Sequence, residues 1–95
     1  MSRLQYKLID RVLESGLMYY KTNATGYSLC GMPDVIIFGS EGRTVFAEVK
    51  EPRDRLSDIQ RHVIQKLEGK GFKVFIIRDH HDIESVIDWF DGETE

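Results

Sequence analysis

The chain has 95 residues, of which 41% are hydrophobic and 31% charged, and its formal net charge is −3. This length and balance predict one small globular domain over residues 1–95, and no apolar run approaches the roughly 20 residues that would span a membrane. The first residues lack the apolar segment of a secretory signal, and the lone cysteine, Cys30, cannot form an internal disulfide. We therefore expect a reducing, cytoplasmic setting and no membrane partner.

The charges are unevenly distributed along the chain. Residues 1–49 are neutral on balance, residues 50–78 carry +4 and residues 79–95 carry −7. The basic middle predicts either phosphate contacts or a solvated helix face. We expect the structured core to cover about residues 3–90 and the last residues, 91–95, to form an acidic tail.

The N-terminal third predicts a helix, a strand and a loop. Apolar residues at helical spacing indicate a helix over residues 4–15, which Gly16 is expected to end. Residues 17–21 form a candidate strand, and residues 22–32, rich in Gly, Ser, Thr and Asn, a loop. We expect Cys30, in that loop, to be a small buried apolar residue.

Residues 34–50 contain two apolar runs around a turn, which predicts a β-hairpin. A two-residue turn would place the acid that opens the first run and the acid near the end of the second on opposite faces. A three-residue loop with Gly42 in the left-handed conformation instead pairs Gly39 with Arg43. We favour this second register because glycine stands at the position that the loop requires.

In the favoured register Asp34 lies opposite Glu48, and Lys50 shares their face. Two carboxylates this close repel each other, so one is driven to protonate unless a cation neutralises them. Hard oxygen ligands suit Mg²⁺ or Mn²⁺, and a nearby lysine would orient an attacking water or stabilise negative charge. The trio fits phosphodiester hydrolysis, and the alternative is a structural ion pair of Lys50 with one of the acids.

The C-terminal half predicts a connection, a helix, a strand and a last helix. Pro52 prevents the sheet from continuing into residues 51–55. Ser57 and Gln60 form a capping-box pattern that opens a helix, and Gly69 ends it. Two elements complete the chain, a strand over 72–78, expected to be covered on both faces, and a short helix over 83–90.

The helix between the strands at 44–50 and 72–78 requires a right-handed crossover, which makes these strands parallel. The predicted order is therefore αβββαβα. We expect an α/β fold with an αβββαβ core, a mixed central sheet flanked by helices, and a short C-terminal helix.

A Pro-Asp pair at 33–34, followed after one hairpin by Glu-Val-Lys at 48–50, resembles the PD-(D/E)xK nuclease motif. Over roughly residues 3–90 the chain more specifically resembles the VRR-NUC domain, the virus-type replication-repair nuclease domain. The matching stretches are Gly31-x-Pro33-Asp34, Glu48-Val49-Lys50, Leu56-Ser57-x-x-Gln60 and Gly71-x-x-Val74. The resemblance implies a restriction-endonuclease-like fold and a stand-alone protein of phage or bacterial type, located in the bacterial host cell if a phage encodes it.

The resemblance also implies the site. Asp34 and Glu48 would be metal ligands, the main-chain carbonyl of Val49 a third, and Lys50 catalytic. The cofactor would be Mg²⁺, with Mn²⁺ able to substitute, and no nucleotide cofactor is expected. The family usually has a glutamate on the first helix, but residues 1–9 contain no acid. Gln5 stands near that place, either as a ligand or partner of a metal-bound water or as a polar flank of the helix.

Stand-alone members of the family resemble Holliday-junction resolvases and act as homodimers, which implies branched DNA, a four-way junction, as the partner. A two-fold dimer suits two symmetric cuts. The alternatives are a nicking or flap endonuclease of the same superfamily, a catalytically weak DNA-binding or scaffolding module, and a metal-independent interaction domain.

Several further residues are candidates for supporting roles. Gln60 would either close the capping box or, as the resemblance implies, lie near the active site against Lys50 or DNA. Arg53 and Arg55, in the adjacent connection, and Lys21 are candidate phosphate contacts.

The stretch His-His-Asp at 80–82 has no third ligand at zinc spacing. It predicts a surface turn in which Asp82 caps the last helix. Tyr19, Tyr20 and Tyr27 are expected in the core or at a dimer seam rather than stacked on bases.

Overall fold

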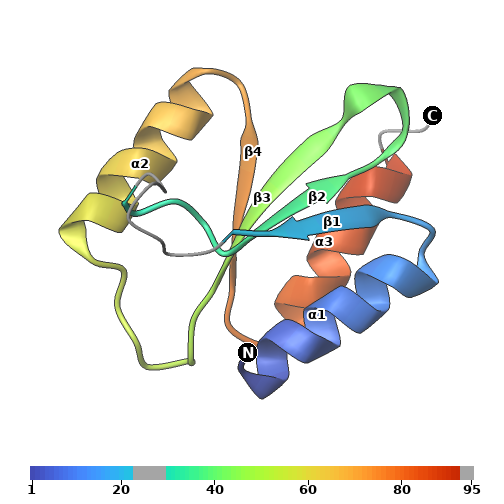
Figure 1. Ribbon diagram of the computed structural model, residues 1–95, viewed down its shortest axis with the longest axis horizontal. Helices are drawn as coiled ribbons and strands as arrows, with labels where there is room; N and C mark the ends of the chain where they lie inside the picture. Colours follow the sequence, from blue (N-terminus) through green and yellow to red (C-terminus); the bar gives the residue numbers. More distant parts are fainter. Residues whose placement is uncertain (23–29, 93–95) are drawn as a thin grey trace.

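A computed structural model of the chain describes residues 1–22 and 30–92 (Figure 1). Tyr27, most of the loop expected over 22–32 and the end of the acidic tail lie outside the described residues. The elements are α1 (Arg3–Glu14), β1 (Met18–Lys21), β2 (Val35–Phe38), a 3-10 turn η1 (Ser40–Gly42), β3 (Thr44–Val49), α2 (Asp58–Gly69), β4 (Lys73–Ile77) and α3 (His80–Gly92). The predicted α/β class and the order αβββαβα are confirmed.

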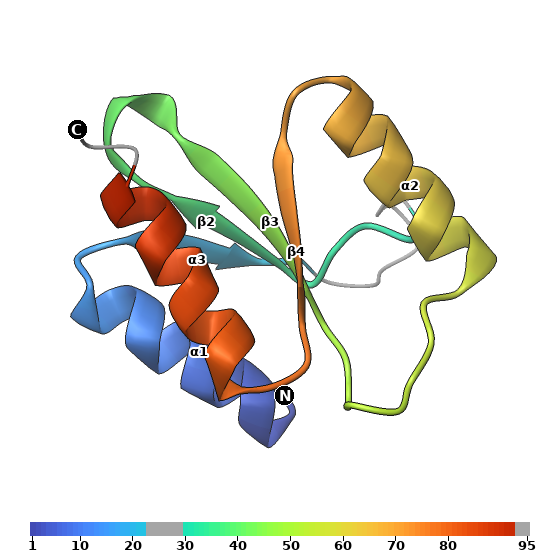
Figure 2. The same cartoon turned by 180° about the vertical axis from the view of Figure 1, so that it is seen from behind.

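The four strands form one mixed sheet in the order β1-β2-β3-β4. The pairs β1–β2 and β2–β3 are antiparallel, and β3–β4 is parallel, as the crossover predicted. Helices α1 and α3 lie together on one face, and α2 lies on the other (Figures 1 and 2). None of the helices in the described part of the chain is long and apolar enough to cross a membrane.

The core lies between the sheet and the pair of helices α1 and α3. Alternate strand residues face it, as the period of a strand requires, and their side chains are fully buried. The central members are Leu8 and Val12 of α1, Val35 and Ile37 of β2, Val45 and Ala47 of β3, and Ile83 and Val86 of α3. The intervening residues of β2 and β3 face the side of the sheet that carries α2, and Asp34 and Glu48 continue this second set.

The hairpin turn has the predicted register. The Gly39 amide donates to the Arg43 carbonyl at 2.9 Å, and Ile37 pairs with Val45. Gly42 has the left-handed conformation that the loop requires, with φ at +76°. Turn chemistry therefore determines which face of the hairpin each later residue occupies.

The last helix differs from the prediction. It begins at His80 and continues to Gly92, so it is longer than the helix expected over 83–90. Asp79 caps the helix: its Oδ1 accepts a hydrogen bond from the Asp82 amide at 3.0 Å. Asp82 was expected to be the cap, but its Oδ2 accepts the Arg78 amide at 2.8 Å instead. The stretch 80–82 is thus the first turn of α3 rather than a surface turn.

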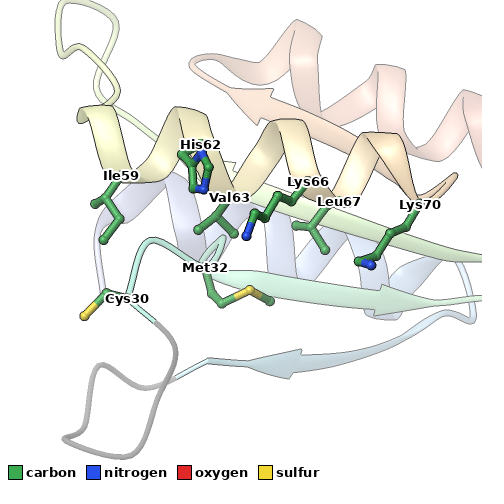
Figure 3. A pocket seen from close by; sticks show the side chains of 8 residues that line it. All are labelled: Cys30, Met32, Ile59, His62, Val63, Lys66, Leu67 and Lys70. Carbon is green, nitrogen blue, oxygen red and sulfur yellow. The ribbon is translucent and has the colours of Figure 1, made fainter.

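Strand β4 contacts α2 and α3 from its two faces, as expected, and because it is an edge strand only Ile77 is fully buried. The expectation that Cys30 is buried, in contrast, is wrong. Cys30 is exposed, at the outer end of a groove along α2 (Figure 3). The next residue, Gly31, lies so close to the start of α2 that a Cβ there would meet the Ile59 carbonyl oxygen at 2.8 Å. Gly31 is thus the residue in contact with α2, and Cys30 lies beside it at the surface.

Candidate active site

Asp34 and Glu48 face each other at one end of the hairpin. The register Val35–Ala47 continues by one pair to bring them opposite, and Asp34 Oδ2 accepts the Val49 amide at 3.0 Å. The Lys50 ammonium nitrogen lies 3.8 Å from Glu48 Oε2. The three residues predicted from the hairpin sequence, Asp34, Glu48 and Lys50, therefore lie together, and the register of β2 and β3 determines their arrangement.

Glu48 is the only buried charged residue in the part of the chain that the structure describes, with a relative exposure of 2%. Burial, and next the negative charge of Asp34, raise its pKa to about 7, while Lys50 opposes the shift. Its Oε1 is buried and has no hydrogen-bond partner among the described residues. Such an oxygen is costly to bury unless something binds it.

Gln60 contacts Glu48 from α2, the helix that covers this face of the sheet (Figure 1). Its Nε2 donates to Glu48 Oε2 at 2.8 Å, and its Oε1 accepts the Ser57 amide at 2.8 Å. The Gln60 amide itself donates to Ser57 Oγ at 3.1 Å, which completes the capping box. The two roles that the sequence posed as alternatives occur together, and the residue touched is Glu48 rather than Lys50.

The donor set fits a hard divalent cation. Two carboxylates and one main-chain carbonyl, that of Val49, offer oxygen atoms only, which is the set that Mg²⁺ and Mn²⁺ prefer. The unpartnered Oε1 of Glu48 is the observation that favours a cation here over a simple ion pair with Lys50.

A second group of possible metal ligands lies away from this site. One ligand atom each of Asp79, His81 and Asp82 lie within 4.8 Å of one another. Both carboxylates already accept backbone amides at the start of α3, which explains their positions without an ion. The sequence showed no third ligand at zinc spacing beside His-His-Asp at 80–82; in the structure Asp79, the residue before α3, completes the group.

Gln5 is half-buried in the first turn of α1. Its backbone amide donates to Ser2 Oγ at 3.1 Å, whereas no hydrogen bond of its side chain is seen within the described residues. The neighbouring Arg3 and Lys7 line a cleft together with Glu51 and Pro52. The start of α1 therefore approaches the connection that follows Lys50, while Gln5 itself is not joined to the acids.

The candidate phosphate contacts gather around the same end of the sheet. Arg53 and Arg55 are exposed in the connection between β3 and α2. Lys21 pairs with Val35 at the end of β1, and the next residue, Thr22, donates its amide to the Asp34 carbonyl at 2.8 Å. Lys21 shares the face of Val35, however, and not the face of Asp34 and Glu48, so the register does not bring its side chain to the acids.

Arg78 is a residue that the sequence analysis did not select. Its Nη1 donates to backbone carbonyls of Glu51, Pro52 and Asp54, all in the connection after Lys50. The only sequence signal was its place at the end of an apolar strand expected to lie beside β3.

These features define a small α/β domain with an acid–acid–lysine site of nuclease type at one end of a mixed sheet. The sequence pattern of the VRR-NUC domain matches residues 20–80, a range that contains Asp34, Glu48, Lys50 and Gln60. The chain therefore belongs to the VRR-NUC domain family and is a nuclease domain of that superfamily, whose members typically use divalent metals.

Solved structures show the same fold. One described as a VRR_NUC domain matches with a TM-score of 0.78 and 23% identity, covering 90% of this chain and 91% of that one. Hjc from Archaeoglobus fulgidus, a Holliday junction resolvase from an archaeal hyperthermophile, matches with a TM-score of 0.57 and 19% identity, over 79% of this chain and 63% of that one. No curated protein gives a significant match.

Proposed function

We propose that this protein is a homodimeric, metal-dependent DNA endonuclease that cuts four-way junctions, with Mg²⁺ as cofactor and Mn²⁺ able to replace it. The observation that carries the proposal is the buried, unpartnered Oε1 of Glu48, opposite Asp34 and beside Lys50. We further propose that it works in the cytoplasm, that of a bacterial host if a phage encodes it.

In this proposal Asp34, Glu48 and the Val49 carbonyl hold the metal. The ion would lower the pKa of a bound water and neutralise charge on a phosphoryl oxygen. Lys50 orients the attacking water or stabilises the negative charge that develops on the phosphate. The Val49 amide and Gln60 Nε2 each donate to one carboxylate oxygen, which leaves the other oxygen of each acid for the metal.

Two observations support DNA as the proposed substrate: the basic charge of residues 50–78 and the similarity of the fold to that of a junction resolvase. Residues 50–78 carry the excess of basic side chains, among them Arg53 and Arg55 in the connection after Lys50, and Lys21 lies at the same end of the sheet. Phosphate contacts from such residues position a nuclease without reading sequence. The fold is similar to that of Hjc, a Holliday junction resolvase. A two-fold dimer would present two sites to the two strands that a resolvase must cut.

The test uses a labelled four-way junction and matched duplex, single-stranded and flap DNAs, each with Mg²⁺, Mn²⁺ or EDTA. We expect symmetric, metal-dependent cuts in the junction, and a dimer by sedimentation. Lys50→Ala should abolish cleavage and leave junction binding within about threefold, because it removes no metal ligand. Cutting of flaps alone would select the flap-endonuclease alternative, and a Lys50→Ala protein with normal activity would remove Lys50 from the mechanism.

A second candidate is a DNA-binding or scaffolding module with weak catalysis. The observation that favours it is Gln5, a neutral side chain where the family usually has an acid. Junction binding without cleavage in any metal would support this candidate over the first.

A further inference from the structure

One guanidinium group holds the connection that leaves the active-site strand. Arg78 Nη1 lies 3.1 Å from the Glu51 carbonyl oxygen, 3.4 Å from that of Pro52 and 2.6 Å from that of Asp54. The connection has no other hydrogen bond to β4 or α3 among the described residues except the Lys50 amide, which donates to the Ile77 carbonyl at 2.9 Å. Two consecutive residues at the end of β4 thus fix both Lys50 and the chain that follows it.

The backbone of Arg78 is itself fixed by a hydrogen bond to the start of α3. Its amide donates to Asp82 Oδ2 at 2.8 Å, and the Asp82 amide donates to Asp79 Oδ1 at 3.0 Å. The first turn of α3 therefore fixes the backbone from which the guanidinium extends. Hydrogen bonds from a charged donor are stronger than neutral ones, so this contact is well suited to order an exposed segment that has no regular structure of its own.

The held segment carries one of the candidate phosphate contacts. Arg53 stands between Pro52 and Asp54, whose carbonyls both accept from Arg78, so the path of the chain is fixed on each side of it. The Arg53 side chain is exposed and forms no ion pair within the part of the chain that the structure describes. Its charge is available to a ligand.

The same contact shapes a cleft beside the site. Arg78, Glu51 and Pro52 line one side of a cleft of about 210 Å³, and Arg3 and Lys7 of α1 line the other. Moving the connection would change the distance between Arg53 and these two cations. A duplex or junction arm presents phosphates at regular spacing, so the spacing of cations decides how many of them bind at once.

We propose that Arg78 is a positioning residue for DNA: it fixes the connection after Lys50 so that Arg53, together with Arg3 and Lys7, meets backbone phosphates next to the cleavage site. This inference rests on the proposed nuclease function.

The test compares Arg78→Gln with Arg43→Gln. Arg43 is a matched control because it also donates to backbone carbonyls, those of Ser40 and Phe90, but in the β2–β3 turn at the opposite end of the hairpin. We expect Arg78→Gln to raise the KM for DNA about tenfold and to leave kcat within about threefold. Arg43→Gln should leave both near the wild-type values, and Arg78→Lys should recover part of the loss.

A double variant shows whether Arg78 acts through the connection. If it does, Arg53→Gln combined with Arg78→Gln should raise KM little beyond the larger single effect, because both changes remove the same contact. Three results would each overturn the proposal. They are a double variant whose increase in KM is the product of the two single increases, a change in kcat without a change in KM, and equal increases in KM for Arg78→Gln and Arg43→Gln.

A measurement without DNA separates this inference from the proposed function. The Asp54 amide donates to the Glu51 carbonyl at 3.0 Å inside the connection, and its hydrogen exchange should be faster in Arg78→Gln than in wild type or Arg43→Gln. If wild type neither binds nor cuts DNA, the proposed function fails, and with it the proposed role in DNA binding, whereas faster exchange would still show that Arg78 orders the connection. Unchanged exchange would overturn the inference even in an active nuclease. Should Arg78→Gln not fold, Arg78→Lys is measured in the same way, with the same criteria.

Discussion

Gln60 and Glu48 are joined by a hydrogen bond of 2.8 Å from the side-chain amide of one to the carboxylate of the other. The opposite end of the same amide accepts the Ser57 backbone amide. One side chain therefore helps to begin α2 and also holds Glu48, an acid of the candidate site, in place. The Gln60 side chain thus links the start of α2 to Glu48, so a substitution at Gln60 affects both the helix cap and the candidate site.

This coupling predicts different outcomes for two substitutions in the capping box. Ser57→Ala removes the Oγ acceptor and should cost about 1 kcal/mol of the free energy of unfolding with little effect on cleavage, since Gln60 keeps its contact with Glu48. Gln60→Ala should cost at least as much and also lower kcat about tenfold, because Glu48 loses its donor. Denaturant unfolding and single-turnover cleavage measure the two effects. Equal loss of activity in both variants would show that only the helix start matters.

The hairpin could be predicted from the sequence because its information is local. Gly42 selects a three-residue loop, the loop fixes the register, and the register places Asp34 opposite Glu48. Each step depends on residues adjacent in the chain. The same holds for α2, whose capping pattern lies within four residues.

The contacts of Arg78 and the exposure of Cys30 could not be predicted in this way. Arg78 donates to carbonyls 24 to 27 residues away along the chain, and backbone carbonyls leave no pattern in a sequence. Cys30 is exposed beside Gly31, and Gly31 is the residue that approaches α2 closely, a contact between segments distant in the sequence. Gln60 was identified, but its two roles were treated as exclusive, although an amide offers a donor and an acceptor at once.

The pKa of Glu48 predicts a pH-dependent stability. Its folded value of about 7 lies above the ordinary 4.5, so between these values the folded chain binds more protons than the unfolded chain. The free energy of unfolding should therefore fall as pH rises through this window, by at most on the order of 3 kcal/mol from this group. Glu48→Gln should remove that fall, whereas Glu68→Gln, at an exposed position of α2, should keep it. Denaturant unfolding in EDTA, so that no cation binds Glu48, measures the slope from about pH 5 to about pH 8, and an unchanged slope in Glu48→Gln would contradict the assignment.

Asp34→Asn should weaken Mn²⁺ binding by at least about tenfold in calorimetry. The asparagine oxygen can still accept the Val49 amide, so the fold is retained while the charge is lost. Removing the negative charge of Asp34 should also lower the pKa of Glu48. The control is His81→Ala, in the group formed with Asp79 and Asp82. A loss of Mn²⁺ affinity in His81→Ala but not in Asp34→Asn would move the metal to the start of α3.

Gln5→Glu tests whether a side chain at position 5 of α1 can reach the metal site. Ser2-x-x-Gln5 repeats the pattern of Ser57-x-x-Gln60, yet only the Gln5 backbone amide bonds to its cap, which leaves the Gln5 side chain available. A carboxylate there should tighten Mn²⁺ binding severalfold if it reaches the site, because it adds a charged oxygen ligand. It should also stabilise α1 by about 0.5 kcal/mol, since the first turn has no acid. Tyr6→Glu, at an exposed neighbouring position, is the control for this helix effect. Stabilisation in both variants with no gain in Mn²⁺ affinity for Gln5→Glu would place Gln5 outside the metal site.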